Sequence, residues 1–295
     1  MIVVTGAGGQ LGRAVIEQLL DRLNPEQFGV SVRDPQEVQD LEQRGVRVRH
    51  GDFTVPASLV GAFQGASRVL VVSADTTGEE AVRRHRTAIA AAVSAGAQRV
   101  VYTSRMGADR TSPYAPMPDH AATEAILQES GVAFTSLRNG FYASTVLELL
   151  ASASRTGELR APDDGPVAWT THADLAAGAV LALTGDLFDG PTPPLTGPEA
   201  LDMTDVAALA SDLTGRTITR VVVPDAQYHA ELLREGLPEH AADMRVGLFA
   251  ASRRGDFAPA DPTLTRLLDR PSTTLAAFLD ATWRPNGDGV VGDPG

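Results

Sequence analysis

The chain opens with a short apolar run that leads into Thr5-Gly6-Ala7-Gly8-Gly9-Gln10-Leu11-Gly12. Gly6, Gly9 and Gly12 are spaced three residues apart, and a helical pattern follows. A strand, a glycine turn and a helix in this order can cradle a pyrophosphate, because N–H groups at a helix start attract anions. The alternative is a glycine turn without a ligand, but the context favours a dinucleotide site. The backbone contacts expected there involve Gly6, Gly8, Gly9, Gln10 and Leu11.

Apolar runs alternate with helical patterns through the first half of the chain, which is typical of βαβ units. The predicted strands are Ile2–Thr5, Gly29–Val32, Val46–Arg49, Arg68–Val72, Arg99–Thr103 and Ala133–Leu137. The predicted helices are Gln10–Leu23, Pro35–Arg44, Pro56–Phe63, Glu79–Ala95 and Asp119–Ser130. Since the strand Arg68–Val72 is apolar on both faces, the pattern predicts an α/β fold with a Rossmann-type, doubly wound parallel sheet.

The second half is less regular. Its predicted helices are Thr145–Ser154, Thr171–Leu183, Met203–Leu213, Ala226–Glu235, Leu237–Phe249 and Ser272–Ala281, with one strand at Ile218–Val223 and loops over Gly185–Pro198. We expect a nucleotide-binding domain over 1–143 and a smaller α/β substrate lobe over 144–283, partly interleaved with the first. The Gly/Pro/Asp-rich tail, 284–295, has little to bury and is predicted to be disordered.

Composition excludes several functions. The net charge of −12 gives no basic footprint for nucleic acid or an anionic membrane. The chain has no Cys, which excludes disulfides, thiolate metal sites and Cys nucleophiles, and all 25 basic residues are Arg. Mechanisms that need a lysine are therefore excluded, and the six His show no metal-ligand spacing, so we expect no metal.

The same features bear on localisation. We expect no signal peptide, since the first residues lack a basic segment and lead straight into a strand, and no apolar run is long enough to span a membrane. With the lack of disulfides, this fits a cytoplasmic protein. A homodimer remains open.

The end of the second strand indicates which dinucleotide is bound. NAD sites have an acidic residue there, which binds the ribose 2′-hydroxyl. In this chain the residue that directly follows the strand is Arg33. A guanidinium is suited to a 2′-phosphate, which favours NADP(H). The alternative is that Arg33 is solvated and Asp34 binds the hydroxyl.

Two later strand ends add candidates. Asp52 could accept a hydrogen bond from the adenine amino group and Phe53 could flank the ring, although Asp52 could equally be an ordinary turn residue. Ser73, Ala74 and Asp75 follow the fourth strand, beside the point where the strand order reverses and ligands bind.

The glycine loop resembles that of the short-chain dehydrogenases/reductases, in their extended and atypical branch. Most catalytic members have a Tyr-x-x-x-Lys pair after the fifth strand and a Ser or Thr at its end. Ser104 is in place, but Pro118 stands four residues after Tyr114, and the chain has no Lys. A Tyr without a nearby cation is a poor acid/base at neutral pH, which disfavours alcohol dehydrogenation and sugar epimerisation.

A closer resemblance explains the missing pair. The segments 99–104, 120–124, 137–142, 171–176, 236–238 and 271–275 resemble the NmrA-like atypical members, in particular their bacterial NADPH:quinone oxidoreductase branch. The similarity extends to about residue 282. It implies direct hydride transfer from NADPH to a quinone without flavin, for which proximity and orientation supply most of the catalysis.

The resemblance also implies site residues. Thr103, Asn139, Gly140, Phe141 and Tyr142 would line the nicotinamide, with Phe141 and Tyr142 also at the substrate, and Trp169 and His172 would close the pocket. Phe141 and Tyr142 could instead be core residues. No catalytic residue is assigned, and Tyr142 and His120 are weak candidates. His120 could be a proton donor or a residue of the helix start.

Two functions compete. The leading one is an NADPH-dependent reductase of a quinone or similar electrophilic acceptor. The rival is a non-enzymatic NADP(H) sensor, a role known among NmrA-like proteins, which the missing pair suits equally well. NADPH oxidation with a panel of quinones discriminates between them.

Overall fold

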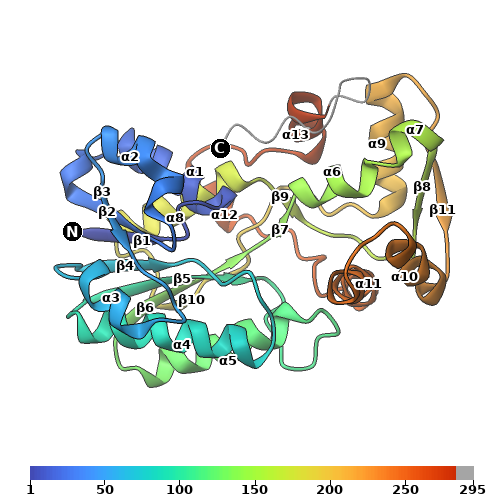
Figure 1. The fold of residues 1–295 in the computed structure, drawn as a ribbon. Coiled ribbons are helices and arrows are strands. Elements are labelled where there is room, and N and C mark those ends of the chain that lie inside the picture. Colours follow the sequence, from blue (N-terminus) through green and yellow to red (C-terminus); the bar gives the residue numbers. More distant parts are fainter. Residues whose placement is uncertain (284–295) are drawn as a thin grey trace.

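Strand β1, Ile2–Thr5, lies within a seven-stranded sheet in the computed structural model, which describes residues 1–283 (Figure 1). The order is β10-β6-β5-β4-β1-β2-β3, and every pair is parallel. The other strands are β2 Phe28–Val32, β3 Arg47–His50, β4 Arg68–Val71, β5 Arg99–Arg105, β6 Ala133–Asn139 and β10 Gly190–Pro191. The strand order reverses between β1 and β4, which confirms the predicted doubly wound α/β fold.

Helices cover both faces of this sheet (Figure 1). On one face lie α1 Gln10–Leu20, α2 Gln39–Gln43, α8 His172–Thr184 and α12 Thr263–Leu268, and on the other lie α3 Pro56–Ala62, α4 Glu79–Ser94 and α5 Pro116–Glu129. Buried leucine, valine and isoleucine side chains of α1 face the sheet at helical spacing. Helix α8 is buried nearly all round, and its many alanines let α1 and the sheet approach it closely.

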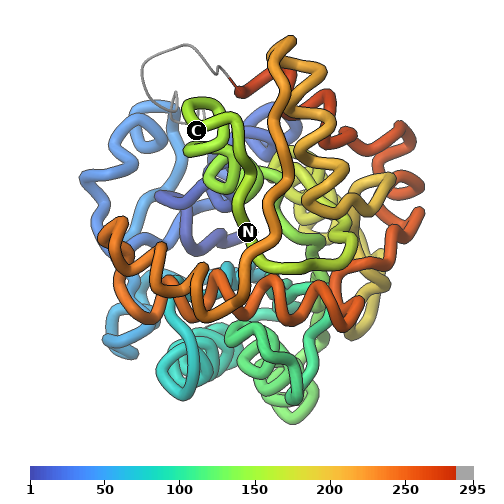
Figure 2. The backbone as a smooth tube through the Cα atoms, turned by 90° about the vertical axis from the view of Figure 1, so that its right-hand side faces the viewer, coloured from blue at the N-terminus to red at the C-terminus, as the bar shows by residue number. Residues whose placement is uncertain are grey.

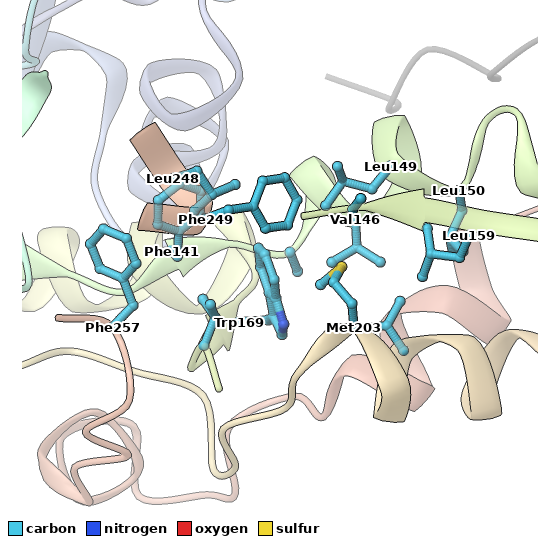
Figure 3. Packing of buried hydrophobic residues seen from close by; sticks show 14 of the residues in the cluster. Phe141, Val146, Leu149, Leu150, Leu159, Trp169, Met203, Leu248, Phe249 and Phe257 are labelled. Carbon is cyan, nitrogen blue, oxygen red and sulfur yellow. The ribbon is translucent and has the colours of Figure 1, made fainter. Parts of the chain in front are cut away.

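A second lobe extends from the carboxyl ends of the strands. Strand β8, Glu158–Ala161, pairs in parallel with β11, Thr219–Val222, and β7, Phe141–Tyr142, pairs with β9, Trp169–Thr170. Its helices are α6 Ser144–Leu150, α7 Ala153–Thr156, α9 Met203–Thr214, α10 Asp225–Arg234, α11 Glu239–Arg253 and α13 Leu275–Thr282. Figure 2 turns this lobe toward the viewer, and Figure 3 shows its aromatic and aliphatic side chains packed into a separate core.

The sequence-based boundaries need correction where elements are short. Strands β7, β8, β9 and β10 and helix α12 were not predicted, because none of them has an apolar run or spacing that marks a strand or a helix. The predicted loop Gly185–Pro198 contains β10, whose Pro191 is tolerated at the edge of the sheet. The predicted helix Thr145–Ser154 divides into α6 and α7, and Pro35–Arg44 divides into a 3₁₀ turn at Pro35–Val38 followed by α2.

The chain crosses between the two lobes more than once. Three elements from beyond residue 143 belong to the first lobe: β10 is an edge strand of its sheet, and α8 and α12 pack on one face of that sheet. A second 3₁₀ turn lies at Pro25–Gln27. The predicted disordered tail, 284–295, lies outside the described residues. None of the helices described is both long and apolar enough to span a membrane.

Asp174 ties α8 to the segment that precedes α13. Its buried carboxylate accepts hydrogen bonds from Thr171 Oγ1 at 3.0 Å and from Thr273 N at 2.7 Å. Its other oxygen lies 2.7 Å from Arg270 Nη2, on a side chain that is half exposed. Burying a carboxylate is costly unless it is hydrogen-bonded, and two bonds from within the fold meet this need for Asp174.

We expect Asp174→Ala to lower the free energy of unfolding by about 2–4 kcal/mol, because two hydrogen bonds to a charged group are lost. The matched variant Arg270→Met should cost less than about 1 kcal/mol, since water can replace a half-exposed cation. Urea unfolding measures both changes. Equal losses in the two variants would show that the ion pair, not the hydrogen bonds within the fold, supplies the stability.

Candidate functional site

The turn between β1 and α1 depends on glycine. Gly6 has a φ of +68°, which favours glycine, and Gly9 N–H donates to Gly6 O at 3.0 Å. A Cβ on Gly12 would lie 2.1 Å from Gly6 O, so only glycine lets α1 pack this close to the turn. No side chain caps α1, so the N–H groups of its first turn face outward without a side-chain acceptor. This arrangement favours an anion at the loop.

A pocket of about 280 Å³ opens beside the loop, at the carboxyl ends of β1, β2 and β4. It brings together most of the residues expected at the adenosine and pyrophosphate end of a cofactor: Gly6, Gly8, Gly9, Arg33, Asp52, Phe53, Ser73, Ala74 and Asp75. Gln10 and Leu11 do not line it; Gln10 is exposed, and Leu11 packs into the core beneath α1. The pocket therefore extends from the glycine loop to the end of β4, along most of the residues predicted to contact the cofactor.

The rim of the pocket carries charges of both signs. Arg33 is exposed, and its Nη2 lies 3.3 Å from Asp75 Oδ2; Arg84 Nη1 lies 3.6 Å from the other oxygen of Asp75. Glu37 reaches over Gly8 from the 3₁₀ turn. Sequence reasoning missed Glu37 and Arg84, because both lie inside helical patterns that give no hint of which face meets the pocket. An exposed pair such as Arg33–Asp75 is weak and is easily exchanged for a ligand phosphate.

Asp52 is held as an acceptor at the pocket wall. Hydrogen bonds from Thr54 N at 2.7 Å and Thr54 Oγ1 at 2.8 Å stabilise the carboxylate and hold the pKa of Asp52 below its usual value. These bonds form an ordinary turn, which is the alternative that the sequence left open. Asp52 also lines the pocket, and its hydrogen bond with an adenine amino group stays a prediction.

The backbone after β4 is fixed by two side chains from neighbouring elements. Ser73 N donates to Thr103 Oγ1 at 2.8 Å, and Ala74 N donates to His85 Nε2 at 2.8 Å. Burial lowers the pKa of His85 to about 4, so its imidazole is neutral and can accept. Thr103 thus positions the wall of the pocket and does not line it.

His120 lies in a buried network and not on the pocket surface. Its Nδ1 is 2.8 Å from the hydroxyl of Tyr102, whose side chain is fully buried. Burial, with a smaller contribution from the Arg105 charge, holds the pKa of His120 well below its usual range. A buried neutral imidazole has little capacity to donate a proton to a substrate, which favours the alternative that His120 is a helix residue.

The residues in the regions of the family's Ser and Tyr, Ser104 and Tyr114, also face the interior. Ser104 Oγ donates to Glu124 Oε1 at 2.8 Å, and Glu124 in turn pairs with Arg138. The ring of Tyr114 packs 5.4 Å from that of Phe141, and burial raises the pKa of Tyr114 further above neutrality. Ser104 and Tyr114 therefore lack the setting of an acid/base pair.

At the end of β6 the packing is tight. A Cβ on Gly140 would lie 2.2 Å from Thr170 Oγ1, so glycine is required there by packing alone. Asn139 is 1% exposed, and its Oδ1 has no hydrogen-bond partner among residues 1–283. A buried acceptor without a partner is costly, so Asn139 is a place where a ligand donor could bind.

Phe141 and Trp169 are core residues in this structure, which corrects their expected place on the substrate surface. Both are at most 3% exposed, and their ring centroids lie 5.6 Å apart, with Phe257 5.0 Å from Phe141 (Figure 3). Apolar side chains of α6 and α11 belong to the same buried cluster. For Phe141 this is the alternative that the sequence left open.

Tyr142 and His172 are only partly buried, and neither lines the pocket beside the glycine loop. Their rings lie 4.3 Å apart, and Arg105 at the end of β5 places its guanidinium carbon 4.4 Å from the Tyr142 ring centroid. Arg105 was missed by sequence reasoning, although one signal existed: it is a cation at the carboxyl end of a central strand. Among residues 1–283 no group of three metal-ligating side chains lies close enough to hold a metal ion.

Comparison with known proteins agrees with this geometry. Residues 6–184 match the family model described as NAD(P)H-binding. Quinone oxidoreductase 2 of Escherichia coli is 36% identical over 287 residues, which cover 97% of this chain and all of that protein. The NAD(P)H azoreductase of Xenophilus azovorans is 32% identical, over 95% of this chain and 97% of that protein.

A solved structure of the Escherichia coli NADPH-dependent quinone oxidoreductase complexed with NADPH superposes with a TM-score of 0.91 at 34% identity. The matched region covers 95% of this chain and 99% of the Escherichia coli chain. The glycine turn, the parallel sheet and these full-length similarities agree. The chain belongs to the NAD(P)H-binding oxidoreductase family that includes quinone oxidoreductase 2 of Escherichia coli.

Proposed function

We propose that this protein is an NADPH-dependent reductase that passes a hydride directly to a quinone or a similar flat electrophile, without a Tyr–Lys pair. The observation that carries the proposal is the pocket that joins the glycine loop to Arg33 and the end of β4. The family relatives named quinone oxidoreductase and azoreductase support the acceptor class, since quinones and azo compounds are both conjugated electrophiles.

The residues present fit a bound NADPH. The uncapped first turn of α1 would hold the pyrophosphate, Arg33 the adenosine 2′-phosphate, and the segment Ser73–Asp75 the central part of the molecule. When bound, the reduced nicotinamide supplies the hydride. The chain's part is to orient the two reactants, and water can protonate the reduced acceptor.

Three of the candidates among residues 1–283, Ser104, Tyr114 and His120, lack the features of the family's general acid, and a role for Tyr142 stays a prediction. Tyr114 and Ser104 face the interior, His120 is buried and neutral, and the chain has no lysine. A carbonyl that needs protonation during reduction is therefore a poorer substrate class than a quinone, which accepts the electron pair before any proton. The sensor role remains the outcome if saturable binding of NADP⁺ and NADPH is found without turnover.

We expect Arg33→Glu to weaken NADPH binding by about ten- to a hundredfold, because charge-assisted bonds to the 2′-phosphate are lost and a repulsive charge replaces them. NADH binding should change less than about threefold, since NADH has no such phosphate. Calorimetric titration of both nucleotides measures this difference, with Arg86→Glu on the exposed face of α4 as a matched charge reversal. Equal losses for the two nucleotides would contradict the assignment of Arg33.

We expect the wild-type protein to oxidise NADPH with menadione, and Tyr114→Phe to keep kcat within about threefold, because the hydroxyl is not a proton donor. The phenylalanine ring retains the contacts with Phe141 and Phe257. Tyr228→Phe, buried in the second lobe, controls for the loss of a hydroxyl from a buried ring. A fall of about a hundredfold or more in Tyr114→Phe alone would restore an acid/base role and overturn the dyad-free mechanism.

A further inference from the structure

Arg105 ends β5 with a guanidinium that has no ionic partner among residues 1–283. Its Nη1 is buried without a hydrogen bond, while the side chain as a whole is only partly buried. No carboxylate of the described chain pairs with it, in contrast to Arg138, which is neutralised by Glu124. An enclosed cation with unused N–H groups carries a desolvation cost that an anionic ligand would offset.

Two aromatic rings hold this guanidinium in place. Its central carbon lies 4.9 Å from the ring centroid of Phe141 and 4.4 Å from that of Tyr142. Phe141 is fixed in the core by Trp169 and Phe257, as Figure 3 shows. Cation–π contacts satisfy none of the five N–H donors of a guanidinium, which therefore still need hydrogen-bond acceptors. The side chain is thus oriented in advance for a ligand oxygen.

The position of Arg105 relates it to the cofactor pocket. Thr103 lies two residues earlier on the same strand face, and its hydroxyl binds Ser73 N at the pocket wall. Two residues of a strand span roughly 7 Å, so Arg105 begins about that far beyond the wall. Its neighbour across the ladder is Asn139, whose buried Oδ1 also lacks a partner. Two unused polar groups therefore face the same end of the sheet.

We propose that Arg105 forms an anionic-oxygen subsite for a flat aromatic acceptor, and this assignment rests on the proposed function. A quinone that takes a hydride with its electron pair becomes a hydroquinone monoanion, as the C–H bond of the reduced nicotinamide breaks and that ring is oxidised. Arg105 would donate hydrogen bonds to the phenolate oxygen and keep its own protons. Water then supplies the proton that completes the hydroquinone, so the charge of Arg105 does the stabilising that a Tyr–Lys pair does elsewhere.

The test compares two naphthoquinones of the same ring system. Lawsone carries a hydroxyl that is ionised at neutral pH and so presents an anionic oxygen, whereas menadione carries a neutral methyl group. Calorimetry on the protein saturated with NADP⁺ measures binding of each without turnover. We expect the wild type to bind lawsone at least about tenfold more tightly than menadione, and Arg105→Met to lose that preference while menadione binding changes less than about threefold.

Further variants separate charge from fold. Arg105→Lys should keep part of the preference, because it restores the charge without the planar pair of donors. Arg234→Met removes an exposed arginine of α10 and should leave the preference unchanged. If Arg105→Met fails to bind NADP⁺, Arg105→Gln, which keeps a polar side chain without the charge, serves the same comparison.

Turnover gives an independent readout. The kcat for menadione should fall about a hundredfold in Arg105→Met, the loss typical when one donor to a developing oxyanion is removed. An unchanged preference for lawsone in the uncharged variant would overturn the subsite, even if wild-type turnover upholds the reductase function. A lawsone preference that depends on Arg105 without any wild-type turnover would uphold the subsite and reject the reductase function.

Discussion

The close approach of Gly12 to the carbonyl of Gly6 sets the geometry on which the rest of the site depends. A Cβ at Gly12 would lie 2.1 Å from that oxygen. Because glycine has no Cβ, the first helix can start directly beside the turn. Its uncapped N–H groups then point toward the pocket at the ends of β1, β2 and β4. Any wider turn would move the positive end of the helix away from the place where a pyrophosphate would lie.

Around this turn the structure separates charged groups from buried neutral ones. Arg33, Glu37, Asp75 and Arg84 stay at the rim of the pocket, where water screens them and ligands can replace their contacts. His85, Tyr102 and His120 are enclosed under the sheet, where burial keeps the imidazoles neutral. The enclosed network fixes the backbone after β4 and contributes no proton donor of ordinary strength. Arg105 is an exception to this division, since it is partly enclosed and has no partner in the described chain.

The sequence predicted what local patterns encode. Each of the six predicted strands of the first half is present. Short runs rich in β-branched apolar residues and bounded by glycine or charged residues usually form strands. Strand β8 escaped prediction because its sequence, Glu-Leu-Arg-Ala, has no apolar run, and β7, β9 and β10 escaped because two residues form no pattern. Local patterns also limit what could be predicted of the site. The roles of the glycine loop, Gly6 to Gly12, and of Arg33 were predicted from their positions in a known motif. The places of Glu37 and Arg84 depend on which helix face meets the pocket, and that of Arg105 on which aromatic rings pack against the end of β5. The burial of Phe141 depends on a core assembled from distant segments.

The most direct test of the account is a crystal structure of the protein with NADPH. The account predicts the pyrophosphate within hydrogen-bond distance, about 2.7–3.2 Å, of the backbone N–H groups at the start of α1. The 2′-phosphate should lie against Arg33 and the nicotinamide toward the ends of β5 and β6. Density for NADPH at another place, or none at saturating nucleotide, would contradict it.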